Sequence, residues 1–413
     1  MKIQKFSPCF ALVELLGLVL GRALPRWSVA VGALIIFVPN AAFSQFAQAP
    51  VEARVPAAPR LVLGTDEMAH LAYELHITNF YQSTGTLHLR RVAVFANDAT
   101  LPLANFTAVQ VNGLLAHPAD SADTTAGVPI EAGKRVVLFL WLKLPAGVPG
   151  PEVLRHRLEF ESGTGAHQLV EGVLTRVKTA QPIVLSAPLR AGAWLVHEGP
   201  GNHRSHHWGS LVAVNGRVTI PQRYAIDFFG LDATTHAVRT ARDKISDSAS
   251  GDWVGFGAEV LAVANGIVRD MRDGEPNNKP LAALTPPANL TSRTLLGNFI
   301  ALEIAPNVFA SYAHLQPGSL TVKVGDRVRR GAVLGRLGQS GNSNAPHLHF
   351  QVATAATFEE SEGLPFTFKA FTRLGTASIG DILDQATKIL LDAGPKPLHR
   401  RQLPLDGDII NFK

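Results

Sequence analysis

The stretch YAHLQPGSLTVKVGDRVRRGAVLGRLGQSGNSNAPHLHFQV, residues 312–352, consists of short apolar runs separated by glycine-rich turns. Its end, PHLHFQV, predicts a strand in which His347 and His349 point to the same face, because side chains two residues apart share one face of a strand. A histidine pair on a strand face is often an ordinary surface feature. Whether this pair belongs to a metal site therefore depends on what the rest of the chain places near it.

The same stretch contains the second copy of an internal repeat. GDWVGFGA begins at Gly251 and GDRVRRGA begins at Gly325, so both follow the pattern G-D-x-V-x-x-G-A. They continue as EVLAVANG and VLGRLGQSG, and each predicts a turn, a short strand, a second glycine turn and a further strand. Duplicated hairpins of this kind predict a barrel-like β domain built from two related halves.

The composition of the whole chain indicates a β-rich globular protein. Of its 413 residues, 46% are hydrophobic and 17% charged, and there are 36 glycines and 27 prolines. This mix favours strands joined by many turns, so we expect an all-β fold of two or three domains. The run LAYELHI, residues 71–77, alternates apolar and polar residues and predicts a half-buried strand.

The sequence divides into a targeting segment, two β domains and the segments that join them. Residues 45–60 are rich in Ala and Pro and predict a linker. Short strands with turn signals between residues 61 and 180 predict an Ig-like β-sandwich. We further predict a connector at 181–200, the domain of the histidine pair at 201–375, and a C-terminal tail at 376–413.

Residues 1–44 predict a signal peptide that is removed on export. Four basic residues precede the apolar run at 27–38, which is short for a membrane span, and small residues lead to a cleavage site after Ser44. We therefore expect a periplasmic or secreted protein. If the N-terminus stayed uncleaved, it would give transient membrane association instead.

Cleavage would change the chemistry available to the mature chain. It would remove the one cysteine, Cys9, so neither a disulfide nor a thiolate zinc ligand is expected. It would leave 34 Lys and Arg against 32 Asp and Glu, a near-neutral balance that gives no case for nucleic acid as a partner. We expect a monomer.

Residues that suit a zinc site lie in three further segments. Asp227, in YAIDFFG, sits in an apolar strand where an unpaired carboxylate is costly, so a partner is expected, either a metal or an arginine such as Arg223. His314 closes another apolar strand, and the turn GNHRSHHWG holds further histidines. One carboxylate and two imidazoles make a tetrahedral zinc site with an open position for water. The helical motif H-E-x-x-H is absent, so such a site must be built on strands.

At these residues the chain resembles the lysostaphin/LytM-type zinc metallopeptidases. The likeness rests on Y-x-H-L, V-x-x-G-D-x-V-x-x-G, G-x-S-G-N-S and H-L-H-F in the order found within 312–352, together with YAIDF upstream. It implies a duplicated-hybrid-motif β domain that cuts peptide cross-links of bacterial peptidoglycan. It also implies that Asp227 and His349 are zinc ligands, and that His314 and His347 are the unligated catalytic pair.

One position departs from that family. Its first ligand is a histidine four residues before the aspartate, and here this position is Arg223, which stays protonated and cannot bind zinc. A hairpin turning at Asn215–Gly216 would bring His207 to the height of Asp227, so we predict His207 as the third ligand. His206 is the next candidate and His203 the last.

The sequence thus predicts an exported zinc metalloendopeptidase, with a peptidoglycan peptide as substrate and Zn2+ as cofactor. The alternative is a non-catalytic LytM-like module that binds or activates another cell-wall hydrolase, which Arg223 at the expected ligand position favours. The Pro- and Asn-rich insertion at 273–297 fits either a wall of the site or a solvated loop. The pattern leaves open which peptide bond is cut and what the first domain recognises.

Overall fold

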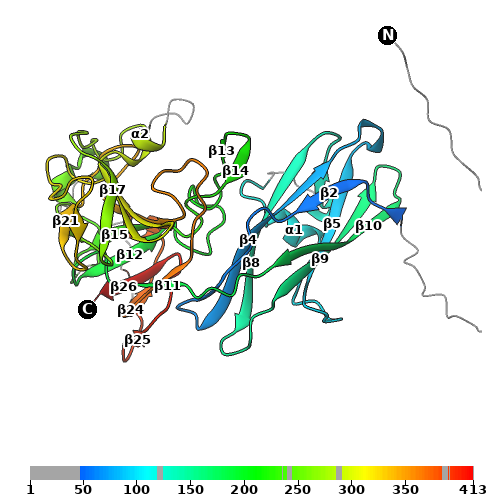
Figure 1. Cartoon of the computed structure of the whole chain (residues 1–413), viewed down its shortest axis with the longest axis horizontal. Coiled ribbons are helices and arrows are strands. Elements are labelled where there is room, and N and C mark those ends of the chain that lie inside the picture. The colour runs from blue at the N-terminus through cyan, green and yellow to red at the C-terminus, as the bar shows by residue number, and fades with distance from the viewer. Residues whose placement is uncertain are drawn as a thin grey trace, which may run out of the picture. The chain divides into compact units, whose positions relative to one another are not determined.

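The protein is almost all β, which confirms the expected fold class. The computed structural model contains 45% strand and 7% helix (Figure 1). It describes residues 47–118, 124–234, 236–239, 244–284, 291–383, 389 and 391–412. The predicted signal peptide lies outside these residues. Within the described parts of the chain, no helix is long and apolar enough to cross a membrane.

Two sheets form the first part of the described chain. The first has the order β1-β10-β9-β5-β6, with β7 on β5, and the second has the order β2-β4-β3, with β8 on β4. The strands of the first sheet are β1 (Ala47–Gln48), β5 (Leu87–Ala96), β6 (Ala104–Phe106), β7 (Val128–Ile130), β9 (Val153–Ser162) and β10 (His167–Arg176). Those of the second are β2 (Val51–Arg54), β3 (Leu61–Leu63), β4 (Met68–Asn79) and β8 (Arg135–Pro145).

One apolar cluster fills the space between these two sheets. It takes Leu71, Tyr73, Leu75 and Ile77 from β4 and alternate residues from β8, β5 and β9. The opposite face of β4 is buried as well, since every residue from Ala69 to Asn79 is buried. The expected half-buried strand is therefore wrong in one respect, because segments from the second half of the chain cover its polar face. The Ig-like assignment and the domain boundaries stay predictions.

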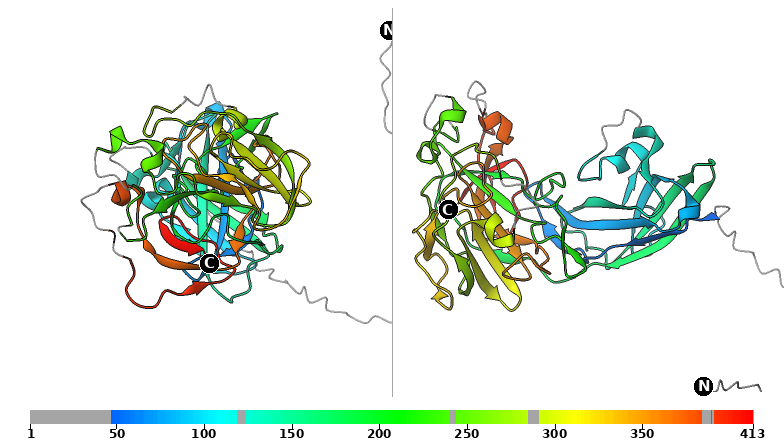
Figure 2. Two further views of the ribbon diagram at one scale, coloured as in Figure 1. Left: turned by 90° about the vertical axis from the view of Figure 1, so that its left-hand side faces the viewer. Right: turned by 90° about the horizontal axis from the view of Figure 1, so that it is seen from above.

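A ten-stranded sheet organises the second half of the chain. Its order is β20-β17-β18-β19-β22-β15-β12-β26-β24-β25. The strands are β12 (Ala193–His197), β15 (Ile226–Leu231), β17 (Gly266–Arg272), β18 (Phe299–Ala305), β19 (Val308–Ala313), β20 (Arg327–Val328), β22 (Leu348–Ala353), β24 (Phe371–Thr376), β25 (Leu398–His399) and β26 (Asp408–Phe412). Figure 2 shows the red strand near the C-terminus beside an orange strand, as the pairing of β26 with β24 requires.

Smaller elements complete the described fold. Three strand pairs are β11 (Ile183–Leu185) with β23 (Phe366–Phe368), β13 (Val212–Val214) with β14 (Arg217–Thr219), and β16 (Glu259–Leu261) with β21 (Val333–Arg336). The short helices are α1 (Ala108–Asn112), α2 (Ser292–Leu296) and α3 (Ile379–Leu383). Single 3-10 turns are η1 (Gln82–Thr84), η2 (Thr124–Ala126), η3 (Ile245–Asp247) and η4 (Ser250–Asp252).

The internal repeat is confirmed in the backbone. The two copies pair with each other through β16 and β21, and their hydrogen bonds are reciprocal. Gly257 N–H donates to the carbonyl of Leu337, and its counterpart Gly331 donates to that of Ala262, both at 2.8 Å. Both glycines have positive φ, 78° and 80°, a conformation that costs other residues a clash at Cβ. The matched glycines thus mark one turn used twice.

Three segments that we expected to be connections contain strands. Residues 45–60 include β1 and β2, residues 181–200 include β11 and β12, and the tail from 376 includes β25 and β26. Both β12 and β26 lie inside the ten-stranded sheet. Their short apolar runs are buried on both faces, so they lack the alternation that identifies a half-exposed strand. Composition alone therefore misplaced these segments.

Candidate metal centre

Asp227 lies in the middle of the ten-stranded sheet. β15 is buried along its whole length and pairs with β12 on one side and β22 on the other. In these pairs, Asp227 stands opposite His197 and opposite His349. Residues directly opposite each other in an antiparallel pair share one face of the sheet. The strand register itself therefore brings a carboxylate and two imidazoles together.

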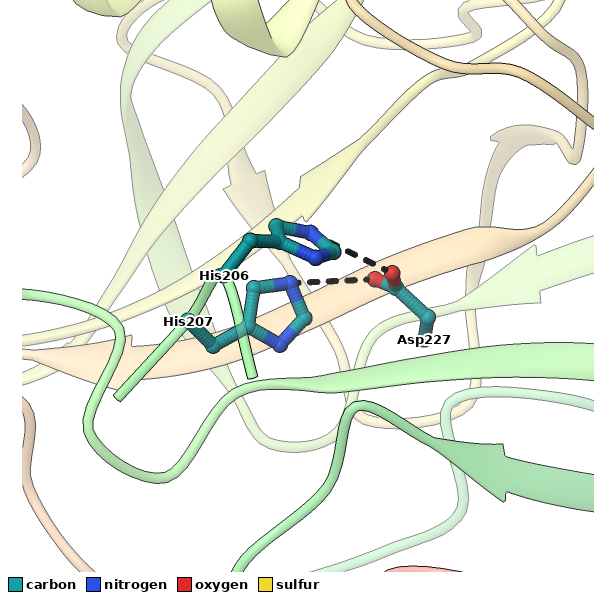
Figure 3. A group of neighbouring side chains, drawn as sticks. All are labelled: His206, His207 and Asp227. Carbon is teal, nitrogen blue, oxygen red and sulfur yellow. Dashed lines mark ion pairs between the residues drawn. The ribbon is translucent and has the colours of Figure 1, made fainter. Parts of the chain in front are cut away.

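Four histidine rings reach the carboxylate of Asp227, which is only 3% exposed. Its Oδ1 lies 3.0 Å from Nδ1 of His349 and 3.4 Å from Nε2 of both His207 and His347. Its Oδ2 lies 3.8 Å from Nε2 of His206. Figure 3 shows His206 and His207 from one loop, both directed at this carboxylate. These rings are the partners that a buried carboxylate requires.

Arg223 is not the partner of Asp227, so that interpretation is wrong. Its guanidinium is buried and forms a two-pronged ion pair with Glu74, at 2.9 Å from Nε to Oε1 and 2.7 Å from Nη2 to Oε2. Nη1 donates to Glu362 at 2.8 Å. The residue at the expected ligand position is thus occupied elsewhere, and Asp227 is left to the histidines.

Burial sets the charge of the groups around this carboxylate. Burial alone would raise the pKa of Asp227, but His347 and His207 oppose it and hold that pKa well below its usual value. Burial holds the pKa of His207 well below the usual value for histidine. It does the same for His314, where His347 and His349 add to the effect. An ionised aspartate and neutral imidazoles are the forms that bind metals.

Outer hydrogen bonds determine which nitrogen of each ring faces Asp227, Nε2 in His207 and Nδ1 in His349. A carbonyl oxygen only accepts, so a ring nitrogen that contacts one carries the proton. Nδ1 of His207 contacts the carbonyl of Glu198 at 2.9 Å, and Nε2 of His349 contacts the amide oxygen of Gln351 at 2.9 Å. In that tautomer the other nitrogen of each ring presents a lone pair to Asp227. Such outer contacts fix the tautomer of metal-binding histidines.

These contacts fit a cation between the groups. Two lone pairs and a carboxylate oxygen face one another, an arrangement that repels unless a cation or a proton lies between them. Nε2 of His207 is buried and has no hydrogen-bond partner among the described residues. Two neutral imidazoles and one carboxylate are a donor set that Zn2+ takes with a fourth position open. Zn2+ is the cofactor that this set fits.

The two predicted catalytic histidines lie beside this set. The rings of His314 and His347 have centroids 4.7 Å apart, and those of His314 and His349 lie 5.9 Å apart. Nδ1 of His314 donates to the carbonyl of Ser340 at 2.8 Å, and Nδ1 of His347 donates to that of Ala345 at 2.8 Å. Nε2 is therefore the second nitrogen of each ring, and in His347 it lies 3.4 Å from Oδ1 of Asp227. His347 also stacks on Phe229, with centroids 5.1 Å apart.

The three candidate histidines of the upstream turn, His203, His206 and His207, differ in whether they reach Asp227. Nε2 of His203 donates to the carbonyl of Gly113 at 2.7 Å, so His203 takes no part in the cluster around Asp227. His206 and His207 both reach Asp227, and with it they form a group whose donor atoms lie within 4.8 Å of one another. The side chain of His206 is 64% exposed and its Nδ1 lies 3.1 Å from Glu198. His207, 1% exposed, is the buried donor.

The reason given for the proximity of His207 to Asp227 was only partly right. The hairpin at Asn215–Gly216 forms, with positive φ at both residues. It ends at Val212 and Thr219, however, and β15 then pairs with β12 and β22 instead of continuing the hairpin. A loop anchored by Glu198 and Ser205 carries His207 to the site.

The insertion at 273–297 contacts the turn that presents the histidine strand. Asn278 donates from its side chain to the carbonyl of Ser343 at 3.0 Å, and its backbone N–H donates to that of Gln339 at 3.0 Å. Leu281 N–H donates to the carbonyl of Asn344 at 2.6 Å. The described part of this insertion is therefore attached to the site, which argues against a purely solvated loop.

Several residues of the site were not found from the sequence. Gln351 was accessible to the strand argument, because it follows His349 by two residues on the same face. Ser340, in the turn before the histidine strand, orients His314 through its carbonyl. Glu198 and Glu74 act through contacts distant in sequence, and no local pattern marks them.

Comparisons with known proteins concern the second half of the chain. Residues 252–360 match the model of Peptidase family M23. This match contains His314, His347 and His349 but neither His207 nor Asp227. Over 67 residues the chain is 40% identical to the glycyl-glycine endopeptidase ALE-1 of Staphylococcus capitis, and this covers 16% of the chain. The chain spans only 18% of that relative.

Solved structures of similar proteins include two catalytic domains. That of lysostaphin from Staphylococcus simulans is 19% identical, with 41% of this chain and 88% of that chain covered and a TM-score of 0.21. A mutant catalytic domain of the prophage-encoded M23 protein EnpA from Enterococcus faecalis is 22% identical, with 31% and 88% covered and a TM-score of 0.19. Residues 252–360 of this chain are thus similar to peptidase family M23.

Proposed function

We propose that this protein is an exported zinc metalloendopeptidase that hydrolyses peptide bonds in peptidoglycan cross-links. The observation that carries the proposal is the buried carboxylate of Asp227 with histidine nitrogens 3.0–3.4 Å from its Oδ1. A purely structural aspartate needs one or two hydrogen-bond donors. Lone pairs fixed inward by outer hydrogen bonds suit a metal better than a proton network.

The assignment of roles follows from burial and from the orientation of each ring. His207 through Nε2, Asp227 through a carboxylate oxygen and His349 through Nδ1 would hold the zinc. When bound, zinc supplies a Lewis acid that polarises the scissile carbonyl and lowers the pKa of a nucleophilic water. We assign His349 and not His206 as a zinc ligand, because the His349 ring is buried on the sheet and the His206 ring is exposed.

His314 and His347 would act on the substrate directly. The low pKa of His314 keeps its imidazole neutral near pH 7, so Nε2 can accept the proton of the attacking water. The adjacent His347, held through Nδ1 by Ala345 and stacked on Phe229, would stabilise the charge on the carbonyl oxygen as an imidazolium, with a second proton on Nε2. The two roles are exchangeable in this geometry, since both rings present Nε2.

The substrate and the location are parts of the same proposal. The curated relative is a glycyl-glycine endopeptidase, which supports a peptide substrate of the cell-wall type. The N-terminal pattern of residues 1–44 supports export to a periplasm or to the medium, with membrane association only if this segment is retained. We propose that the protein acts as a monomer.

A non-catalytic role is the second candidate, and Arg223 at the expected ligand position favours it. Two measurements on the mature protein separate the two functions. The enzyme hypothesis expects about one zinc per chain, release of soluble peptides from cell-wall sacculi, and a His347→Ala variant that keeps zinc but releases none. His349→Ala should lose both. Absence of zinc from the reloaded wild-type protein, or zinc without any peptide release from sacculi, would favour the binding module.

A further inference from the structure

Glu74 occupies an unusual position for a carboxylate. It lies on β4 in the first part of the chain, on the strand face that segments from the second half cover, and it is 2% exposed. Its Oε1 accepts from Nε1 of Trp208 at 2.5 Å and from Nε of Arg223 at 2.9 Å. Its Oε2 accepts from Nη2 of Arg223 at 2.7 Å. All of these donors come from the second half of the chain.

Both partners of Glu74 are attached to the metal centre through short segments of chain. Trp208 follows His207 directly, and Arg223 precedes Asp227 by four residues. Gln222, next to Arg223, places its side-chain amide 3.3 Å from Nε2 of His349. A displacement of either segment would therefore move donors of the zinc site.

The geometry of the Glu74 contacts is more specific than burial requires. A buried ion pair is often no more stabilising than apolar residues of the same size. A guanidinium bound through two nitrogens to one carboxylate, however, fixes direction as well as distance. Trp208 adds an indole packed edge-on against Trp141 and Phe139, with ring centroids 5.7 and 5.8 Å away. Glu74, Trp208 and Arg223, here the Glu74 cluster, thus form one connected junction between β4 and the two segments.

We propose that Glu74 is a positioning residue for the metal centre: it holds the segments of His207 and Asp227 at the spacing that zinc requires. The inference rests on the proposed metal site. It gives Arg223 a role at a position where the resembling family has a ligand. The first domain, through one strand, becomes part of the zinc site rather than a separate recognition module.

The test is the zinc affinity of the full mature chain, measured by competition with a chelator of known affinity. Glu74→Gln keeps the size of the side chain and removes the charge, and we expect at least a tenfold rise in the zinc dissociation constant. Arg223→Lys keeps the charge but loses the two-pronged contact, and we expect about a fivefold rise. Glu362→Gln, which removes the other carboxylate on Arg223, is the matched control and should change the constant less than threefold.

A thermal melt of each metal-free variant separates positioning from stability. A lower melting temperature with unchanged zinc affinity in Glu74→Gln would overturn the inference. If Glu74→Gln does not fold, the zinc affinities of Arg223→Lys and Trp208→Phe provide the test. Wild-type zinc affinity in both variants would also overturn the inference. Wild-type protein that binds one zinc but cleaves no substrate would refute the proposed function alone, because the affinity comparison would still stand. A wild-type chain without zinc would overturn both.

Discussion

Replacing His207 by alanine should remove zinc from this protein. The ring is 1% exposed and its Nε2 faces Asp227 at 3.4 Å without another partner among the described residues. Changing a residue that only orients a metal ligand typically weakens metal binding about 10–100-fold. Removing one of three protein donors should exceed this, so we expect zinc binding at least about 100-fold weaker, or about 2.8 kcal/mol at 1.4 kcal/mol per factor of ten.

The assay is a chelator competition on the mature chain, with zinc content after dialysis as a second readout. His203→Ala is the matched control, because this histidine lies four residues upstream and donates to the carbonyl of Gly113 instead of reaching Asp227. We expect the control to bind zinc within about twofold of wild type, a difference of about 0.4 kcal/mol. A melt of each metal-free variant shows whether the deletion of the buried ring has disturbed the fold, for which a cavity cost of about 1–3 kcal/mol is reasonable.

One outcome would contradict the assignment of His207 as a ligand. Full zinc affinity in a folded His207→Ala variant would show that its inward lone pair is not a ligand. If His206→Ala then lost zinc, the donors would be His206, Asp227 and His349, despite the exposure of the His206 ring. If neither variant lost zinc, the site would have to be built without this loop.

Three further predictions follow from single contacts. Gln351→Leu removes the acceptor that orients His349, and zinc affinity should fall about 10–100-fold; an unchanged affinity in the chelator assay would contradict this role. Gly331→Ala forces a side chain into a positive φ of 80°. The free energy of unfolding in urea should therefore fall by about 1 kcal/mol. Gly251→Ala, at a turn without positive φ, is the control and should change it by less than about 0.5 kcal/mol. Removal of zinc by a chelator should lower the melting temperature, because free zinc 1,000-fold above its dissociation constant stabilises by about 4 kcal/mol; identical melts would speak against a zinc site in the folded chain.

The sequence predicted the parts of the site that strand periodicity controls. His347 and His349 are two residues apart, so their common face follows from the local pattern, and Asp227 lies within an apolar strand, so its burial does too. The repeat was equally visible, since its turns need glycine at matched positions such as 257 and 331. In these cases the physical requirement falls on a few adjacent residues, and the sequence records it directly.

Segments buried by distant partners could not be predicted in this way. β12 and β26 are short runs covered on both faces, and neither alternation nor composition separates them from connecting loops. The strand β4 was expected to be half-buried, with its polar face exposed. That face is buried because Trp208 and Arg223, more than 130 residues away in the chain, supply the donors that Glu74 needs. A local pattern cannot contain information about such a partner.

Arg223 shows why a motif position should be judged together with its contacts. Taken alone, an arginine where a metal ligand is expected suggests a site that cannot bind zinc or catalyse hydrolysis. In the structure this side chain forms an ion pair with Glu74 instead of reaching Asp227. The carboxylate of Asp227 is approached by the loop that carries His207. A donor can be replaced from any segment that reaches the metal at about 2 Å, so the chemistry constrains the position of the nitrogen and not its place in the sequence. The ligand set is therefore better predicted from which histidine nitrogens reach the buried carboxylate than from spacing within a motif.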